Sequence, residues 1–95
     1  MNVKEAVKVA LEYVADLFKR ESLSNIGLEE VVFDSATNEW KVTVGFSRPW
    51  DYDRPGTLKG MFDPTREKQA RREYKVVHVD AETGEVRSVE IRAQT

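Results

Sequence analysis

The sequence predicts an α+β domain in which one N-terminal amphipathic helix packs on a four-stranded antiparallel sheet. Two patterns favour this fold class. Apolar residues near the N-terminus recur at spacings of three and four, which is typical of one face of a helix. Farther along the chain, apolar and polar residues alternate in short runs bounded by turn-forming residues, which is typical of strands joined in hairpins. The expected order is α-β-β-loop-β-β within residues 1–95, as one domain.

Composition excludes several classes of protein. Of the 95 residues, 40% are hydrophobic and 34% are charged, which is enough apolar material for one small core. There is no cysteine, which excludes disulfides, thiolate metal sites and thiol nucleophiles. The formal net charge of −2 gives no drive toward nucleic acid or an anionic membrane, and neither is expected as a partner. Because no apolar run is long enough for a signal peptide or a membrane span, we expect a cytoplasmic protein.

The helix is expected over residues 2–21. Its apolar face consists of the residues that follow the spacing of three and four, namely Val3, Val7, Ala10, Leu11, Val14, Leu17 and Phe18. Asn2 with Glu5 three residues later is typical of a capping box, in which the Asn side chain accepts a hydrogen bond from a free N–H of the first turn. Lys19 and Arg20 are expected to complement the negative end of the helix dipole.

The first hairpin is expected to join residues 28–34 to residues 40–47 through the turn-rich segment 34–39. Residues 22–27 are expected to separate it from the helix, with Gly27 as the clearest stop signal. The second strand has the clearest alternation in the chain: Trp40, Val42, Val44 and Phe46 alternate with Lys41, Thr43, Gly45 and Ser47.

The second hairpin is expected to join residues 74–80 to a last strand marked by Val86, Val89 and Ile91. The turn between them contains Gly84, placed where a positive φ is needed. With the helix across one face of the sheet, the expected core brings together two sets of apolar residues. They are Val7, Leu11, Val14 and Phe18 from the helix, and Trp40, Val42, Val44, Phe46, Val77, Val79, Val89 and Ile91 from the sheet.

The second hairpin resembles a known family pattern. Residues 74–86, Tyr-Lys-Val-Val-His-Val-Asp-Ala-Glu-Thr-Gly-Glu-Val, are similar to the closing hairpin of PepSY-type domains, and the helix and the strand at residues 40–44 are similar to that family's layout. The resemblance implies an α+β domain that binds or inhibits other proteins, with no catalytic residues to transfer. The long segment 48–65 and the strand that continues after Val86 depart from the family pattern.

Three groups of residues could carry chemistry, but for each of them a structural interpretation is favoured. His78, the only histidine, is interpreted as a sheet-face residue rather than a general base or pH switch. The carboxylates Asp51, Asp53 and Asp63 lack the further oxygen ligands of a calcium loop. The basic residues Arg66, Lys68, Arg71, Arg72 and Lys75 come without a glycine-rich phosphate loop or an aromatic RNA-binding signature. No cofactor or metal site is therefore expected.

The segment 48–65 is the predicted location of function. It contains three prolines and two glycines without a clear period, and residues 66–73 after it form either a short helix or a polar extension of the next strand. Its aromatic, methionine and arginine side chains are of the types enriched at protein interfaces. The candidate interface residues are Arg48, Trp50, Tyr52, Arg54, Met61 and Phe62. An alternative for the four apolar ones is that they fold back and close one end of the core.

The sequence therefore predicts a non-enzymatic binding module, adaptor- or inhibitor-like, whose partner is another protein. It would use the segment 48–65 and the outer face of the sheet. The alternative is a small-molecule-binding or enzymatic domain with a pocket between the helix and the sheet. A homodimer formed through a free sheet edge or face is compatible with either.

Overall fold

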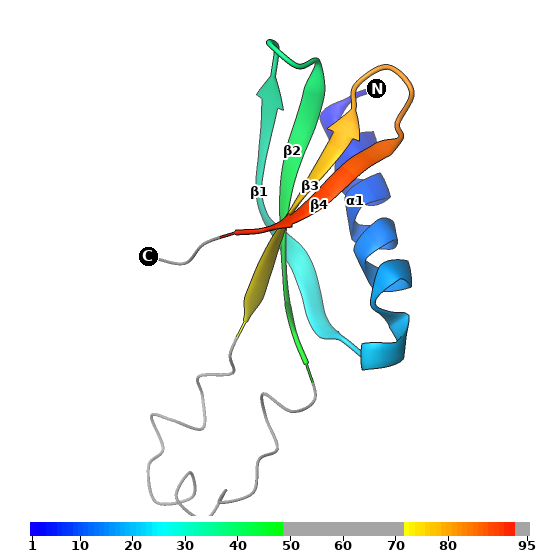
Figure 1. The fold of residues 1–95 in the computed structure, drawn as a ribbon, viewed down its shortest axis with the longest axis vertical. Helices are drawn as coiled ribbons and strands as arrows, with labels where there is room; N and C mark the ends of the chain where they lie inside the picture. The colour runs from blue at the N-terminus through cyan, green and yellow to red at the C-terminus, as the bar shows by residue number, and fades with distance from the viewer. Residues whose placement is uncertain (49–71, 93–95) are drawn as a thin grey trace, which may run out of the picture.

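One helix and four strands make up the part of the chain that the computed structural model describes, residues 1–48 and 72–92. In chain order the elements are α1 (Val3–Leu17), the 3₁₀ turn η1 (Lys19–Glu21), β1 (Ser24–Asp34), β2 (Glu39–Ser47), β3 (Glu73–Asp80) and β4 (Val86–Ile91). The strands form one antiparallel sheet in the order β1-β2-β3-β4, and α1 lies across one face of it (Figure 1). The predicted fold class is confirmed.

The start of α1 agrees with the prediction. Asn2 is the N-cap, and its Oδ1 accepts a hydrogen bond of 2.9 Å from the backbone N–H of Glu5. In return, the carboxylate of Glu5 accepts from the backbone N–H of Asn2, also at 2.9 Å. These two bonds satisfy donors that would otherwise have no partner in the first turn.

The end of α1 differs from the prediction. The helix ends at Leu17, and Lys19 and Arg20 lie in η1, so they do not belong to the last turn of α1. The backbone leaves the helical region at Phe18, whose ring packs against Phe46 at 5.7 Å between centroids. A tightened 3₁₀ turn after a helix end is a common way to redirect the chain.

The break expected over residues 22–27 was also wrong, since β1 already begins at Ser24. Ser22 turns the chain with a left-handed backbone (φ 50°). The pairing of β1 with β2 then shifts register between Ser24 and Gly27 and again between Leu28 and Glu30. These irregularities absorb extra residues in the strand, so Gly27 lies inside β1 opposite Gly45 rather than stopping it.

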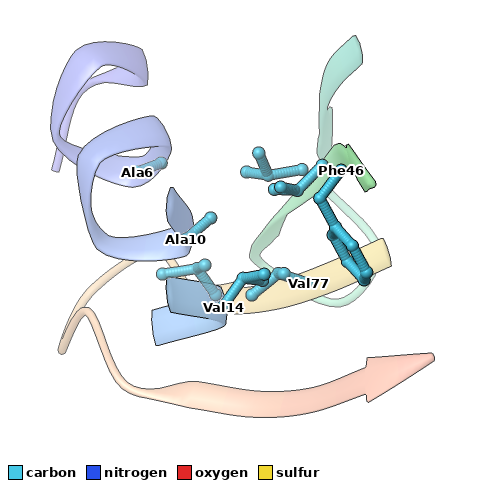
Figure 2. Packing of buried hydrophobic residues seen from close by; sticks show 8 residues of the cluster. Ala6, Ala10, Val14, Phe46 and Val77 are labelled. Carbon is cyan, nitrogen blue, oxygen red and sulfur yellow. The ribbon is translucent and has the colours of Figure 1, made fainter. Parts of the chain in front are cut away.

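The core lies between α1 and the sheet (Figure 2). Its fully buried members are Ala6, Ala10 and Val14 from α1, Val42, Val44 and Phe46 from β2, and Val77 and Val79 from β3. Small side chains on the buried face let the helix approach the strands closely. Five members of the predicted helix face behave otherwise: Val7, Leu11 and Phe18 are only partly buried, and Val3 and Leu17 are exposed.

The prediction that Ile91 belongs to the core was wrong. Its side chain is 79% exposed, although its register opposite Lys75 puts it on the same face of the sheet as the core. Figure 1 shows why: the C-terminal end of β4 runs away from α1, so α1 does not cover it. Trp40 and Val89 lie at the border of the core and are partly buried.

The close contact between α1 and the sheet is tested by enlarging one alanine. Ala10→Leu should lower the free energy of unfolding by about 1–3 kcal/mol, because the site has no room for three more carbons. Ala15→Leu is the matched control, because Ala15 is exposed on the same helix, and it should change stability by less than about 0.5 kcal/mol. Urea denaturation measures both variants, and equal losses would contradict this packing.

Candidate functional site

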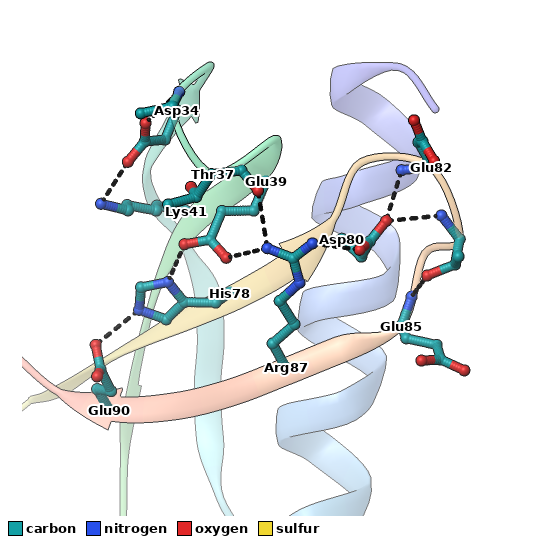
Figure 3. A network of polar contacts seen from close by, with 12 residues as sticks. Asp34, Thr37, Glu39, Lys41, His78, Asp80, Glu82, Glu85, Arg87 and Glu90 are labelled. Atoms are coloured by element: carbon teal, nitrogen blue, oxygen red, sulfur yellow. Dashed lines mark hydrogen bonds and ion pairs between the residues drawn. The ribbon is translucent and has the colours of Figure 1, made fainter.

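The face of the sheet that α1 leaves uncovered holds a network of polar side chains (Figure 3). Lys41 pairs in register with His78, and their neighbours Val42 and Val77 belong to the core on the other face. Because side chains alternate along a strand, Lys41 and His78 point away from α1. This agrees with the interpretation of His78 as a sheet-face residue.

The imidazole of His78 lies between two carboxylates. Its Nδ1 is 2.7 Å from Oε1 of Glu39 on β2, and its Nε2 is 2.7 Å from Oε1 of Glu90 on β4. Burial, with only 14% of the side chain exposed, lowers the pKa of His78, but the hydrogen bonds to the two carboxylates outweigh it and raise the pKa above 6.5. The hydrogen bond from His78 lowers the pKa of Glu39, against the effect of burial.

Arg87 on β4 extends the network to both hairpin turns. Its Nη1 donates to Oε2 of Glu39 at 3.0 Å and to the backbone carbonyl of Thr37 at 2.9 Å. Its Nη2 donates to the carboxylate of Asp80 at the end of β3. One guanidinium therefore connects the turn that follows β1 to the turn that follows β3.

Asp80 organises the second of these turns. Its Oδ1 accepts hydrogen bonds from the backbone N–H groups of Glu82 at 2.8 Å and Thr83 at 2.9 Å. These backbone bonds, together with the bond from Arg87, lower the pKa of Asp80 to about 2. Gly84 follows with φ at 76°, which confirms the need for glycine in this turn.

The network joins the two hairpins through hydrogen bonds and ion pairs. Within residues 1–48 and 72–92, no cluster of His, Cys, Asp or Glu side chains has an arrangement that would hold a metal ion. Each nitrogen of His78 is used by a carboxylate, and Glu39 is bound by both His78 and Arg87. Ion pairs between strands of one sheet stabilise their register.

A second polar cluster lies at the other end of the sheet, around Arg48. This residue directly follows β2, is only 7% exposed, and forms ion pairs with Glu21 of η1 and Glu73 of β3. Its guanidinium also lies 5.7 Å from the ring centroid of Phe18 and 5.1 Å from that of Phe46. Arg48 thus joins the end of the helix, the end of β2 and the start of β3, with cation–π contacts added to the ion pairs.

Arg72, just before β3, is held in a similar way. Its Nη2 is 3.2 Å from Oε2 of Glu29 on β1. The pair lies directly over Gly45 of β2, where a Cβ atom would come within 2.7 Å of Arg72 Nη2 and 2.8 Å of Glu29 Oε2. The absence of a side chain at Gly45 therefore leaves the space that this ion pair occupies.

The structure places one of the predicted interface residues. Arg48 is largely buried, and its contacts are those of an anchor within the domain. The other five, Trp50, Tyr52, Arg54, Met61 and Phe62, lie outside the described residues, as do Asp51, Asp53, Asp63, Arg66, Lys68 and Arg71. Arg72 and Lys75, the rest of the predicted basic cluster, pair with Glu29 and Glu73.

Comparisons of the chain with protein-family models, with curated proteins and with solved structures gave no match. The resemblance of residues 74–86 to PepSY-type domains therefore stays a prediction, although the hairpin on which it rests is present as β3 and β4. In the described part of the chain, α1 is neither long nor apolar enough to span a membrane.

The shifted pKa of His78 gives folding stability a pH dependence. The folded state binds the proton more tightly than the unfolded chain, whose histidine has the ordinary pKa of 6.5. The stabilisation is therefore complete below pH 6.5 and is lost as the pH rises through the folded-state pKa. Glu39, with its pKa below 4.5, has the opposite dependence, and its stabilisation is lost as the pH falls through the lowered pKa.

We accordingly expect the free energy of unfolding to decline as the pH rises from 6.5, where Glu39 and Asp80 are already ionised. Urea denaturation at a series of pH values measures this decline, and His78→Gln should remove most of it. An NMR titration of the imidazole gives the pKa directly. A value at or below 6.5 would contradict the two hydrogen bonds described for this ring.

The anchoring role of Arg48 is tested by Arg48→Met, which keeps an unbranched side chain and removes the guanidinium and its charge. Unfolding free energy should fall by about 1–3 kcal/mol, since Glu21 and Glu73 lose their shared partner next to the core. Arg20→Met is the control: Arg20 lies exposed on η1, and its loss should cost less than about 0.5 kcal/mol. If the two variants are equally stable, Arg48 is not an anchor.

Proposed function

We propose that this chain is a non-enzymatic protein-binding module of the cytoplasm, adaptor- or inhibitor-like, that uses the segment 48–65 and the neighbouring sheet face to bind its partner. The observation that supports this most is the pair of anchors at Arg48 and Arg72. The first lies within residues 48–65, and the second comes shortly after that segment.

The anchors fix where the intervening segment leaves and re-enters the domain. Arg48 is attached to η1 and β3, and Arg72 is attached to β1, so three elements hold the two ends. β2 and β3 are also paired up to their ends, with Phe46 opposite Glu73. A binding segment that starts from fixed ends loses less conformational entropy when it meets a partner.

The composition of the segment supports a protein as that partner. Trp50, Tyr52, Met61 and Phe62 supply large apolar surface, and Arg54 supplies a planar cation. Aromatic and arginine side chains are the residues that most often dominate the binding energy of protein interfaces. The alternative of a ligand pocket under the helix gains no support, because in the described part fully buried side chains fill the space between α1 and the sheet.

The proposal is tested by capture from a native cell extract with the tagged whole chain. Trp50→Ala combined with Phe62→Ala should reduce recovery of the specific partner at least about tenfold, as expected for central interface aromatics. The matched control is Tyr13→Ala combined with Leu17→Ala, which removes an aromatic and an aliphatic side chain exposed on α1. It should leave recovery unchanged.

Circular dichroism and urea denaturation show whether the Trp50 and Phe62 variant remains folded. Arg54→Glu is included because it reverses one charge without removing apolar surface, and it should also weaken capture. A partner that binds the wild type and all of these variants equally would rule out residues 48–65 as the binding segment.

A further inference from the structure

Strand β1 forms one margin of the described sheet, since its inner neighbour is β2 and no other described strand lies beyond it. Along such a margin, every second residue directs its backbone N–H and C=O away from the sheet. An extended segment of another chain can pair with these groups, which is the recognition mode known as strand addition.

The part of β1 suited to such pairing is Glu30–Asp34. Over these residues the register with β2 runs without a shift, from Glu30 opposite Thr43 to Asp34 opposite Glu39. The two irregularities of β1 both lie before this stretch. A bulge disrupts the regular hydrogen-bonding positions of an edge strand. The regular stretch after the bulges is therefore where an incoming strand can pair.

This edge also exposes apolar side chains on both faces of the sheet. Val32, 48% exposed, points away from α1, and Phe33 and Leu28, each 44% exposed, lie on the side of α1. Phe33 is held by a tilted stack on Trp40 at 5.0 Å between ring centroids. The apolar residues of an added alternating strand would cover Phe33 on the side of α1.

The charge of β1 selects a basic partner. The strand contains Glu29, Glu30 and Asp34 and no basic residue. Glu29 is paired with Arg72, and Asp34 is paired with Lys41 at 3.0 Å. Glu30 is exposed and forms no ion pair within residues 1–48 and 72–92, so a lysine or arginine on an incoming strand would meet an uncompensated carboxylate.

The same charges disfavour a second copy of this chain as the occupant. Pairing the regular stretch with itself around a two-fold axis at Val32 would put Glu30 of each copy opposite Asp34 of the other. Like charges directly opposite each other on neighbouring strands are destabilising.

We infer that the edge of β1 at Glu30–Asp34 binds an extended segment of a partner protein in which basic and apolar residues alternate. This inference gives the proposed binding module a second surface and rests on that function. It differs from the proposed function in its location, because none of its residues belongs to the segment 48–65.

The direct test is a titration of the ¹⁵N-labelled whole chain with a peptide of about seven residues in which lysine alternates with valine and threonine. The amides of Glu30–Asp34 should shift and saturate. A control peptide with glutamate at each lysine position should bind at least about tenfold more weakly. Shifts confined to β4, or no shift along β1, would overturn the inference.

Charge reversal at one position tests the selection for a basic strand. Glu30→Lys should weaken the lysine peptide about threefold to tenfold and strengthen the glutamate peptide. Glu82→Lys makes the same change of net charge in the turn after β3 and should alter neither affinity. Unchanged peptide affinities in the Glu30 variant would show that the edge does not select by charge.

Two further measurements separate this inference from the proposed function. Light scattering should give the mass of a monomer for the wild type. A dimer that becomes more stable in Glu30→Ala would support self-pairing of β1 instead. The peptide titration is repeated with the Trp50→Ala and Phe62→Ala variant, which should still bind the lysine peptide. Loss of β1 binding in that folded variant would mean that the β1 edge is not a separate surface.

Discussion

The guanidinium of Arg48 joins the end of the helix, the end of β2 and the start of β3. It pairs with carboxylates from η1 and β3 and lies beside the rings of Phe18 and Phe46. A buried arginine is costly to desolvate, so its position depends on these partners being held in place by the fold. The core holds Phe46 in place, and the rings of Phe46 and Phe18 position the guanidinium of Arg48. Arg48 in turn fixes the start of the segment that we propose as the binding element.

The second constraint is the small-residue face of α1. Ala6, Ala10 and Val14 let the helix lie close to β2 and β3, and a helix of this width covers only part of a four-stranded sheet. One face of the sheet and the outer parts of β1 and β4 therefore lie beyond the helix. On the face away from α1, ion pairs around His78 and Arg87 connect β2, β3 and β4.

Local patterns predicted the fold well, because each element has its own period and its own end signals. The capping box, the alternation over residues 40–47 and the turn at Asp80–Gly84 all correspond to the observed elements. Strand bulges have no comparable signal, so the start of β1 was placed four residues late. Ala6 was missed because a short side chain adds little to an apolar pattern, whereas Ile91 was assigned to the core on its apolar character alone.

The sites show the same limit. The sequence placed His78 on the sheet face, but its partners Glu39 and Glu90 lie 39 and 12 residues away along the chain. Aligning the two hairpins from their turns would have placed Glu39 near His78, since Glu39 pairs in register with Asp80, two residues from His78. The partners of Arg48 come from η1 and from the far side of the segment 49–71, and no local pattern links residues so far apart.

Native-state hydrogen exchange at the end of β2 and β3 nearest Arg48 tests the central claim most directly. Strand ends normally open locally at little cost. If Arg48 anchors this end, the hydrogen-bonded amides among residues 45–47 and 73–75 should open with free energies within about 1 kcal/mol of those around Val42 and Val77 in the core. Opening free energies near zero at residues 45–47 and 73–75, with Val42 and Val77 still protected, would contradict the anchor and remove the main support for the proposed function.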